Sequence, residues 1–478
     1  MIYLKDSFYW KKVKENFLLI FFSFFVSVGC VLISYPGIFY SDSYGRVWIA
    51  DELRTSIKLL LTGQADLMET TECWFSVVPS FLMAICRGFT GNLATYTLAQ
   101  SFSFFLVTFL LIKKLSPKYK WLQYILVLIN PLFYGEAIYY EGGVGCVVGI
   151  GVLVLLLTSH REKNCWADNI IEIVLLIFAS FVTFGYRSNA FTIIPAIVGF
   201  IILQKRNNIK KLVAIGAITL GLIAVLMLPK VLKVDTMGSP MAGFVWDMLT
   251  AIQFMPDQQQ VDYLYYLDEL ASEGATLNAL RKNYDYIVLG YMESEINAKA
   301  LSAEGANEIV LKKYLEFIMR EPKAYIDIKT HFASKTLGIS EKLRYEEYNY
   351  NLNEGMGEWG LNDSVERLMF FRKYFAACQL LGDIILRPWI VYVITMVLVG
   401  IEWLKKSQNR DVLLFMLFLA IFYYGGYLLN TQSFELRYFY PSLYLMWIVD
   451  IMILEKYIIE IGKKIKLQVK RKIDCKTE

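Results

Sequence analysis

The sequence predicts an all-α polytopic membrane protein with about ten transmembrane helices, and three observations support this class. Hydrophobic residues make up 56% of the 478 residues, and the mean hydropathy is +0.43. Only 19% of the residues are charged, against about 25% in soluble globular domains. Apolar runs of about 17–25 residues recur, each long enough to cross a hydrocarbon core of ~30 Å as a helix. Because backbone polar groups in lipid must be satisfied internally, we expect these runs to be helices.

The expected spans begin with a helix that follows Lys11, Lys12 and Lys14. No small-residue cleavage site ends this first run cleanly, so we interpret it as a retained helix and not a cleaved signal. An apolar piece at 74–88 is short and contains Pro79, and it would break the charge alternation if it crossed. We expect it to be an interfacial helix in the first outer loop. The ten spans are placed at about 17–36, 94–112, 121–135, 143–158, 169–186, 190–204, 212–233, 382–403, 412–430 and 437–456.

The loops between these spans alternate in charge, which predicts their sides. Lysine and arginine gather at the N-terminus, at 113–120, 161–163, 205–211 and 405–410, and in the tail after 456. The positive-inside rule makes these segments cytoplasmic. The outer segments are then roughly 37–93, 136–142, 187–189, 234–381 and 431–436.

Three domains follow from this topology. Residues 1–233 form an N-terminal transmembrane module, and 234–381 form a helical extracytoplasmic insertion. Residues 382–478 form the C-terminal transmembrane helices and a basic cytoplasmic tail. In the insertion, apolar residues recur at helical spacing over 309–318, and Pro322 is expected to break that helix.

Composition also excludes several kinds of site. The seven cysteines are scattered and form no Cys-x-x-Cys pair, which argues against a metal cluster or a redox centre. Only His160 and His331 are present, so histidine-based catalysis is not expected, and His331 is assigned a structural role. No extended basic surface is interleaved with aromatic residues, so nucleic acid is not an expected partner.

The candidate functional residues lie on the predicted outer side, starting with Asp42 just after the first span. A carboxylate at a membrane–water boundary can act as a general base or as a metal ligand. The structural alternative is a helix N-cap in the segment Ser41-Asp42-Ser43. Arg46, in the same loop, is a further candidate.

Four glutamates extend the candidate set. Glu136 and Glu141 share a short aromatic loop that ends in two glycines, where they can ligate a divalent cation (Mg²⁺ or Mn²⁺) or orient an acceptor. A solvated turn between paired helices is the alternative. Glu69 and Glu72, beside the interfacial helix, carry the same ambiguity.

Two arginines lie on the side where the positive-inside rule disfavours them. Arg187 is followed by Asn189 in a tight link between two spans, and Arg437 stands between Glu435 and Tyr438 at the start of the last span. Arginine binds phosphate with a bidentate fork, so a polyprenyl phosphate or pyrophosphate is the expected partner. Snorkelling to lipid headgroups is the structural alternative.

The order of these features resembles the GT-C superfamily of integral membrane glycosyltransferases. Tyr35-Pro36-Gly37 ahead of Asp42 looks like the entry to the family's first outer loop, and Ser41 to Arg46 is similar to the Asp-x-x-Gly-Arg stretch of its glucosyltransferase-II branch. Residues 314–326 and 434–441 resemble segments of several uncharacterised bacterial members. The chain departs from the family in two places. It reads Cys73 to Pro79 where many members have His-Pro-Pro, and it has Glu136 and Glu141 in place of an Arg-Asp or Lys-Asp pair, which puts metal use in doubt.

The resemblance implies an enzyme of the bacterial cytoplasmic (inner) membrane, with its active site facing outward. It would transfer a sugar from a polyprenyl-phosphate donor to an extracytoplasmic glycan or lipid-linked acceptor, with membrane lipids around it. Asp42 would be the general base, Arg187 and Arg437 would hold the donor phosphate, and Glu136 and Glu141 would orient acceptor or metal. A polysaccharide polymerase or ligase that joins undecaprenyl-pyrophosphate-linked repeat units is the alternative enzyme. A lipid-linked saccharide transporter, which would place charges in the middle of its spans, is the non-catalytic alternative.

Overall fold

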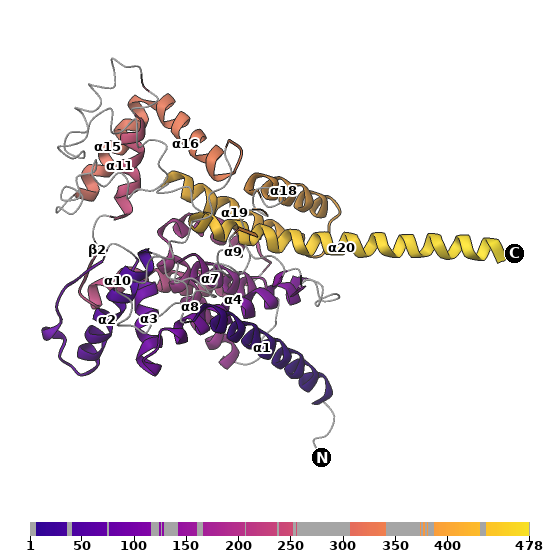
Figure 1. Cartoon of the computed structure of the whole chain (residues 1–478), viewed down its shortest axis with the longest axis horizontal. Helices are drawn as coiled ribbons and strands as arrows, with labels where there is room; N and C mark the ends of the chain where they lie inside the picture. Colours follow the sequence, from indigo (N-terminus) through magenta and orange to yellow (C-terminus); the bar gives the residue numbers. More distant parts are fainter. Residues whose placement is uncertain are drawn as a thin grey trace.

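The computed structural model describes most of the predicted spans and part of the insertion, and it is mostly helical (Figure 1). The first half has α1 (Asp6–Ser34), α2 (Ser41–Leu61), α3 (Val77–Thr90), α4 (Ala94–Leu115), α7 (Gly142–Leu157), α8 (Trp166–Tyr186), the 3-10 helices η1 (Ala65–Leu67) and η3 (Ser188–Ile193), α9 (Ile194–Leu203) and α10 (Asn208–Val231). The second half has α11 (Ser239–Ala251), α15 (Ala306–Arg320), α16 (Pro322–Thr336), α18 (Pro388–Leu404), α19 (Arg410–Leu429) and α20 (Leu436–Thr477). The described residues are 6–35, 41–73, 76–115, 124–125, 127–128, 142–159, 166–205, 207–236, 239–251, 255, 306–340, 373, 376–377, 380, 387–430 and 436–477.

Four of these helices are long and apolar enough to cross a membrane: Ala94–Leu115, Asn169–Tyr186, Asn208–Val231 and Arg410–Leu429. Shorter apolar helices cover Asn16–Leu32, Val77–Thr90, Gly143–Leu157, Ser188–Leu203 and Pro388–Leu404. These helices agree with an all-α membrane protein, whereas most of the predicted span 121–135 lies outside the described residues.

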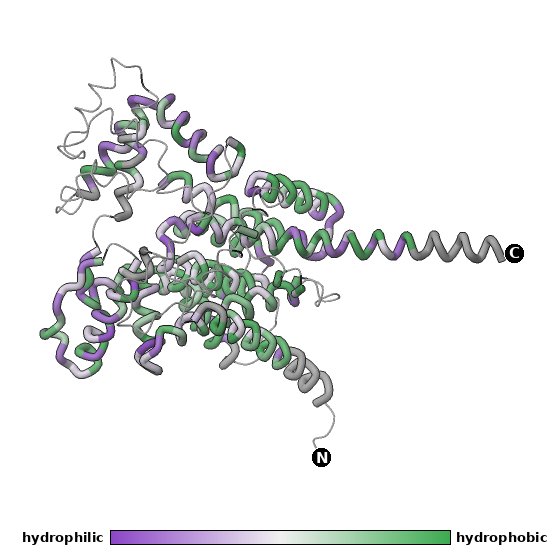
Figure 2. The backbone as a smooth tube through the Cα atoms, in the orientation of Figure 1, coloured by the Kyte–Doolittle hydropathy of each residue, from purple (hydrophilic) through white to green (hydrophobic). Residues whose placement is uncertain are grey.

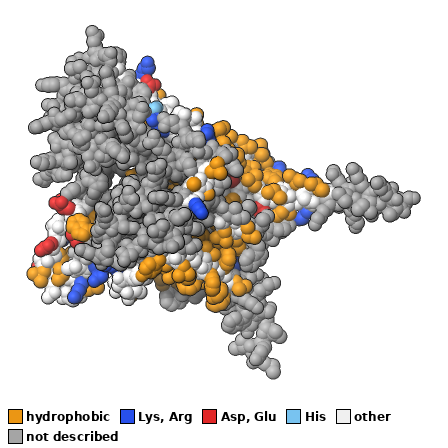
Figure 3. All heavy atoms as spheres, in the orientation of Figure 1, with side chains coloured by type: hydrophobic (Ala, Val, Ile, Leu, Met, Phe, Trp, Pro, Cys, Tyr) orange, Lys and Arg blue, Asp and Glu red, His pale blue; other side chains and the backbone are white. Residues whose placement is uncertain are grey.

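Large apolar side chains cover much of the outside of the bundle, as expected where lipid is the solvent. On α10, Leu212, Leu220 and Leu226 are each more than half exposed. Figures 2 and 3 show this character as continuous hydrophobic helices and as broad apolar patches on the visible face.

The apolar core lies around α7, which packs against α4, α8 and α20. Glycine permits a close approach of α7 to α8, since a Cβ at Gly149 would come within 2.7 Å of the Thr183 backbone nitrogen on α8. Small residues at such positions are typical of helix packing in membranes, where close van der Waals contact replaces the hydrophobic effect.

A smaller core joins α2 to α3. The predicted first outer loop therefore contains a long helix, because Val47, Ala50 and Leu53 recur on one face of α2 and are buried there. Asp51 of α2 forms an ion pair with Arg87 of α3. A helix is observed over most of the 74–88 segment as α3, and it ends where Gly91 adopts a left-handed conformation (φ 73°).

Two short strands connect this smaller core to the end of α10. β1 (Thr71–Cys73) pairs in parallel with β2 (Val234–Thr236), with Thr71 opposite Val234 and Glu72 opposite Asp235.

Beyond β2, the 234–381 segment contains the helices α11, α15 and α16, which pack against one another. The predicted break at Pro322 is confirmed, because α15 ends at Arg320 and Pro322 is the first residue of α16, where its missing N–H costs nothing. α16 also contacts α19, so this helical group packs against one of the membrane-length helices (Figure 1).

Candidate functional site

Two predicted arginines meet at the ends of two helices. α8 ends at Tyr186, and Arg187 then adopts an extended conformation (φ −140°) before η3 begins. Arg437 and Tyr438 lie in the first turn of α20. The Cζ atoms of Arg187 and Arg437 are both 4.9 Å from the centroid of the Tyr438 ring. Residues 250 positions apart in sequence thus share one aromatic ring.

Hydrogen bonds fix these groups, which together we call the arginine cluster (Arg187, Asn189, Arg437 and Tyr438). Arg187 donates to the Arg437 carbonyl oxygen (3.5 Å), and the Asn189 side chain donates to the Tyr438 carbonyl oxygen (3.4 Å). Arg437 also donates to the Tyr438 hydroxyl (3.4 Å). Arg437 is only 4% exposed, whereas Arg187 and Tyr438 are half-buried.

α7 and α19 both contact the cluster. A Cβ at Gly143, in the first turn of α7, would lie 3.3 Å from the Arg437 carbonyl oxygen. The Tyr427 ring of α19 stacks on the Tyr438 ring, with centroids 6.3 Å apart. The cluster is therefore held by five elements: α7, α8, η3, α19 and α20.

Arg46 is buried close to the same helix ends. It is 5% exposed and interacts electrostatically with Tyr96 and Tyr186, whose hydroxyls are 3.1 Å apart. Tyr186 immediately precedes Arg187, and a Cβ at Gly145 of α7 would lie 2.1 Å from its ring. Arg46 is thus linked through Tyr186 to the helix end that carries Arg187.

The structure does not bring all the predicted residues to this place. Glu69 and Glu72 are exposed, and Glu72 lies opposite Asp235. Asp42 belongs to the first turn of α2, one turn before Arg46, but its side chain is outside what the structure describes. Glu136, Glu141 and Glu435 also lie outside the described residues. Among the residues that are described, no three His, Cys, Asp or Glu side chains are grouped to hold a metal ion.

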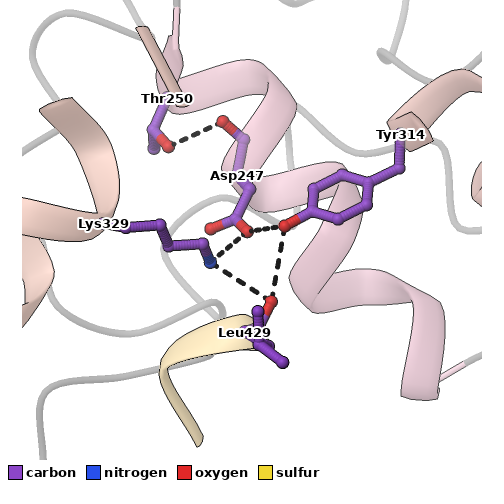
Figure 4. Close-up of polar contacts among 5 residues, drawn as sticks. All are labelled: Asp247, Thr250, Tyr314, Lys329 and Leu429. Atoms are coloured by element: carbon purple, nitrogen blue, oxygen red, sulfur yellow. Dashed lines mark hydrogen bonds and ion pairs between the residues drawn. The ribbon is translucent and has the colours of Figure 1, made fainter. Parts of the chain in front are cut away.

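A second polar group, absent from the predicted site, lies where α16 meets α19 (Figure 4). We call it the Asp247 network: Asp247 of α11, Tyr314 of α15, Lys329 of α16 and the carbonyl of Leu429 at the end of α19. The Asp247 side chain is fully buried and forms an ion pair with Lys329. Tyr314 donates to Asp247 Oδ2 (2.8 Å). Tyr314 and Lys329 also both donate to the Leu429 carbonyl oxygen, at 3.4 and 3.2 Å.

Burial decides the protonation behaviour of this network. Desolvation raises the pKa of Asp247, although Lys329 and Tyr314 oppose that change. The same burial lowers the pKa of Lys329, opposed by the charge of Asp247. Desolvation and the nearby Asp247 charge raise the pKa of Tyr314, which therefore remains a hydrogen-bond donor.

No motif marks the Asp247 network in the sequence, because its members are 67 and 82 residues apart. The one local sign is a lone carboxylate in the apolar run Phe244-Val245-Trp246-Asp247-Met248-Leu249. A charge at such a position requires a partner, but the sequence does not say which one.

No protein-family model, curated protein or solved structure matches this chain.

Proposed function

We propose that this chain is a membrane glycosyltransferase that transfers a sugar from a polyprenyl-phosphate donor to an extracytoplasmic glycan or lipid-linked acceptor. The observation that supports this most is the meeting of Arg187 and Arg437 on one tyrosine ring. Because both guanidinium carbons are 4.9 Å from the same centroid, their separation is at most twice that distance. One phosphate headgroup with its attached sugar can therefore contact both.

The position of the cluster suits a lipid-linked substrate. Arg187 follows a helix of membrane length, and Arg437 lies in the first turn of α20, whose first half is rich in buried apolar residues. Groups at the ends of such helices lie at the level of the lipid headgroups, so a polyprenyl tail can stay in the hydrocarbon while its phosphate reaches the arginines.

The proposed reaction needs a base and a stabilised leaving group. Asp42 accepts the proton of the acceptor hydroxyl, whose oxygen then attacks the anomeric carbon of the donor sugar. The bond from that carbon to the phosphate oxygen breaks, and the polyprenyl phosphate leaves with the electron pair. Arg187 and Arg437 bind the phosphate charge that increases in this step.

A binding measurement tests the phosphate assignment without knowledge of the sugar. The purified protein in nanodiscs is titrated with undecaprenyl phosphate and, in parallel, with undecaprenol, which has the same chain and no phosphate. We expect phosphate-dependent binding that falls by roughly tenfold or more in Arg187→Gln and in Arg437→Gln, since a charged hydrogen bond contributes about 1.5–3 kcal/mol. Arg54→Gln, at an exposed position of α2, is the matched control. Equal binding of both lipids would overturn the assignment.

Mass spectrometry of lipid-linked intermediates then tests the reaction. A deletion strain complemented with Asp42→Asn should lack one sugar substituent on its surface glycan and accumulate the polyprenyl-phosphate sugar. Collapse of long chains to single repeat units would instead make the protein a polymerase, and normal glycan would remove the role of Asp42.

A further inference from the structure

The last turns of α19 touch both the Asp247 network and the arginine cluster. The Leu429 carbonyl, at the end of the helix, accepts hydrogen bonds from Lys329 and Tyr314. Two residues earlier, Tyr427 stacks on Tyr438. A single helix end thus lies between the α11–α15–α16 group and the residues proposed to bind phosphate.

Two contacts, two helical turns apart on α16, join it to α19. Lys329 reaches the Leu429 carbonyl, and two turns later the Thr336 hydroxyl is 2.6 Å from the Tyr424 hydroxyl. Phe332, between them on the same face of α16, is fully buried. Lys329 also brings positive charge to a helix C-terminus, where the aligned peptide dipoles favour it.

α19 is in turn packed tightly against η3, which carries Asn189. The Thr192 hydroxyl donates to the Phe422 carbonyl oxygen (2.8 Å), and a Cβ at Gly426 would lie 2.1 Å from that hydroxyl. Because there is no free space at this contact, a shift of the end of α19 must move η3 as well. Asn189 would move with it, and Asn189 holds the Tyr438 carbonyl.

We propose that Lys329, with Asp247 and Tyr314, is a positioning residue for the arginine cluster: the network fixes the end of α19, and α19 fixes Tyr438, whose ring both arginines contact. This inference rests on the proposed function for its phosphate-binding readout. The mechanical coupling can be measured separately from that readout.

The burial of the ion pair indicates that the Asp247 network positions the end of α19 more than it stabilises the fold. Burial disfavours the charged forms of both partners, so the pKa of Asp247 is raised and that of Lys329 is lowered. Where both groups are charged, the buried pair lowers the free energy of unfolding relative to two exposed groups. An apolar pair of similar volume should therefore fold at least as well, whereas removal of one partner leaves a buried charge.

The pH dependence has a definite sign. The groups that face Asp247 are Lys329, Tyr314 and Tyr325, together with the Leu429 carbonyl that Lys329 and Tyr314 share. On acidification Asp247 takes a proton at a higher pH than an exposed aspartate would, and the ion pair is lost. On the alkaline side Lys329 loses its proton below the usual range for lysine. The α16–α19 contact should accordingly be tightest between these limits.

The decisive variant is the double substitution Asp247→Leu with Lys329→Met. We expect its midpoint of thermal unfolding in detergent to equal or exceed that of the wild type. We also expect its affinity for undecaprenyl phosphate to fall by roughly tenfold, because small displacements of positioned groups have large effects. Hydrogen–deuterium exchange should rise at 188–193 and 436–442. Lys329→Arg keeps the charge and the donors and should retain binding, and Lys323→Met removes an exposed lysine from the same helix as a control.

The outcomes separate the two proposals. If the double variant binds the lipid as the wild type does and exchange at 188–193 is unchanged, the network is only structural and the inference is wrong. If exchange rises there but neither Arg187→Gln nor Arg437→Gln affects lipid binding, the coupling holds and the phosphate assignment fails.

Discussion

At the scale of one residue, substitution of Tyr438 tests whether Arg187 and Arg437 act together. Its ring face contacts two guanidinium groups, and its hydroxyl accepts a hydrogen bond from Arg437 (3.4 Å). Each cation–π contact contributes about 0.5–2 kcal/mol, depending on exposure. We predict that Tyr438→Leu weakens binding of undecaprenyl phosphate by roughly tenfold or more. Titration of the nanodisc-embedded protein measures this directly.

Tyr438→Phe is the matched control, since it keeps the ring and removes only the hydroxyl. Near wild-type affinity is expected for this variant. If Tyr438→Phe is as weak as Tyr438→Leu, the hydroxyl and not the ring face organises the arginines.

Some residues of the two polar groups could be predicted from the sequence, and others could not. Loop charge placed Arg187 and Arg437 on the same predicted side, and only the resemblance implied that they act together; the structure brings them to one ring. The Asp247 network was not predicted, because only the packing of α11, α15, α16 and α19 brings its members together. The exposed Glu69 and Glu72 look the same in the sequence as a glutamate in a site, since burial is not visible there.

At the scale of elements, glycine sets how closely the helices approach. A Cβ at Gly221 of α10 would lie 2.6 Å from the Ile177 carbonyl oxygen of α8, and backbone cannot move aside as a flexible side chain can. We predict that Gly221→Ala separates α8 from α10 and costs about 1–3 kcal/mol. Thermal unfolding in detergent should show a lower midpoint.

Gly216→Ala, on the same helix, provides the comparison. Nothing lies within 4 Å of a Cβ at Gly216. Alanine is favoured over glycine in a helix by roughly 0.5–1 kcal/mol, so this midpoint should hold or rise. A similar loss in both variants would mean that the α8–α10 contact is looser than the structure shows.

Elements were easier to predict than their boundaries. Apolar runs gave the spans now seen as α4, α8, α10 and α19, and Pro322 marked the junction of α15 and α16. A helix in the first outer loop was expected only as the structural alternative for Asp42, with an N-cap in Ser41-Asp42-Ser43, because a helix rich in charged residues has no long apolar run; α2 begins at Ser41. α20 continues to Thr477, well past the predicted end of its span at 456, since helix propensity does not stop where hydrophobicity does.

At the scale of the whole molecule, the length and the charge of α20 predict how the protein is oriented in the membrane. Its 42 residues extend about 63 Å at ~1.5 Å per residue, roughly twice the ~30 Å hydrocarbon core. The half that begins at Arg437 is largely buried in the bundle, whereas the half after Lys456 is rich in lysine and projects from it (Figure 1). By the positive-inside rule, the projecting half is expected in the cytoplasm and the arginine cluster on the outer side.

Labelling of single cysteines tests this orientation. In a background without the seven native cysteines, cysteine is introduced at four exposed positions, Glu69, Lys205, Lys323 and Lys406. A membrane-impermeant maleimide added to intact cells should label positions 69 and 323, and positions 205 and 406 only after the membrane is opened. Because 323 lies on α16, which is seated on the end of α19, its labelling also reports the side of the arginine cluster. The reverse pattern would place both arginines in the cytoplasm, where a donor that presents its sugar outside could not reach them.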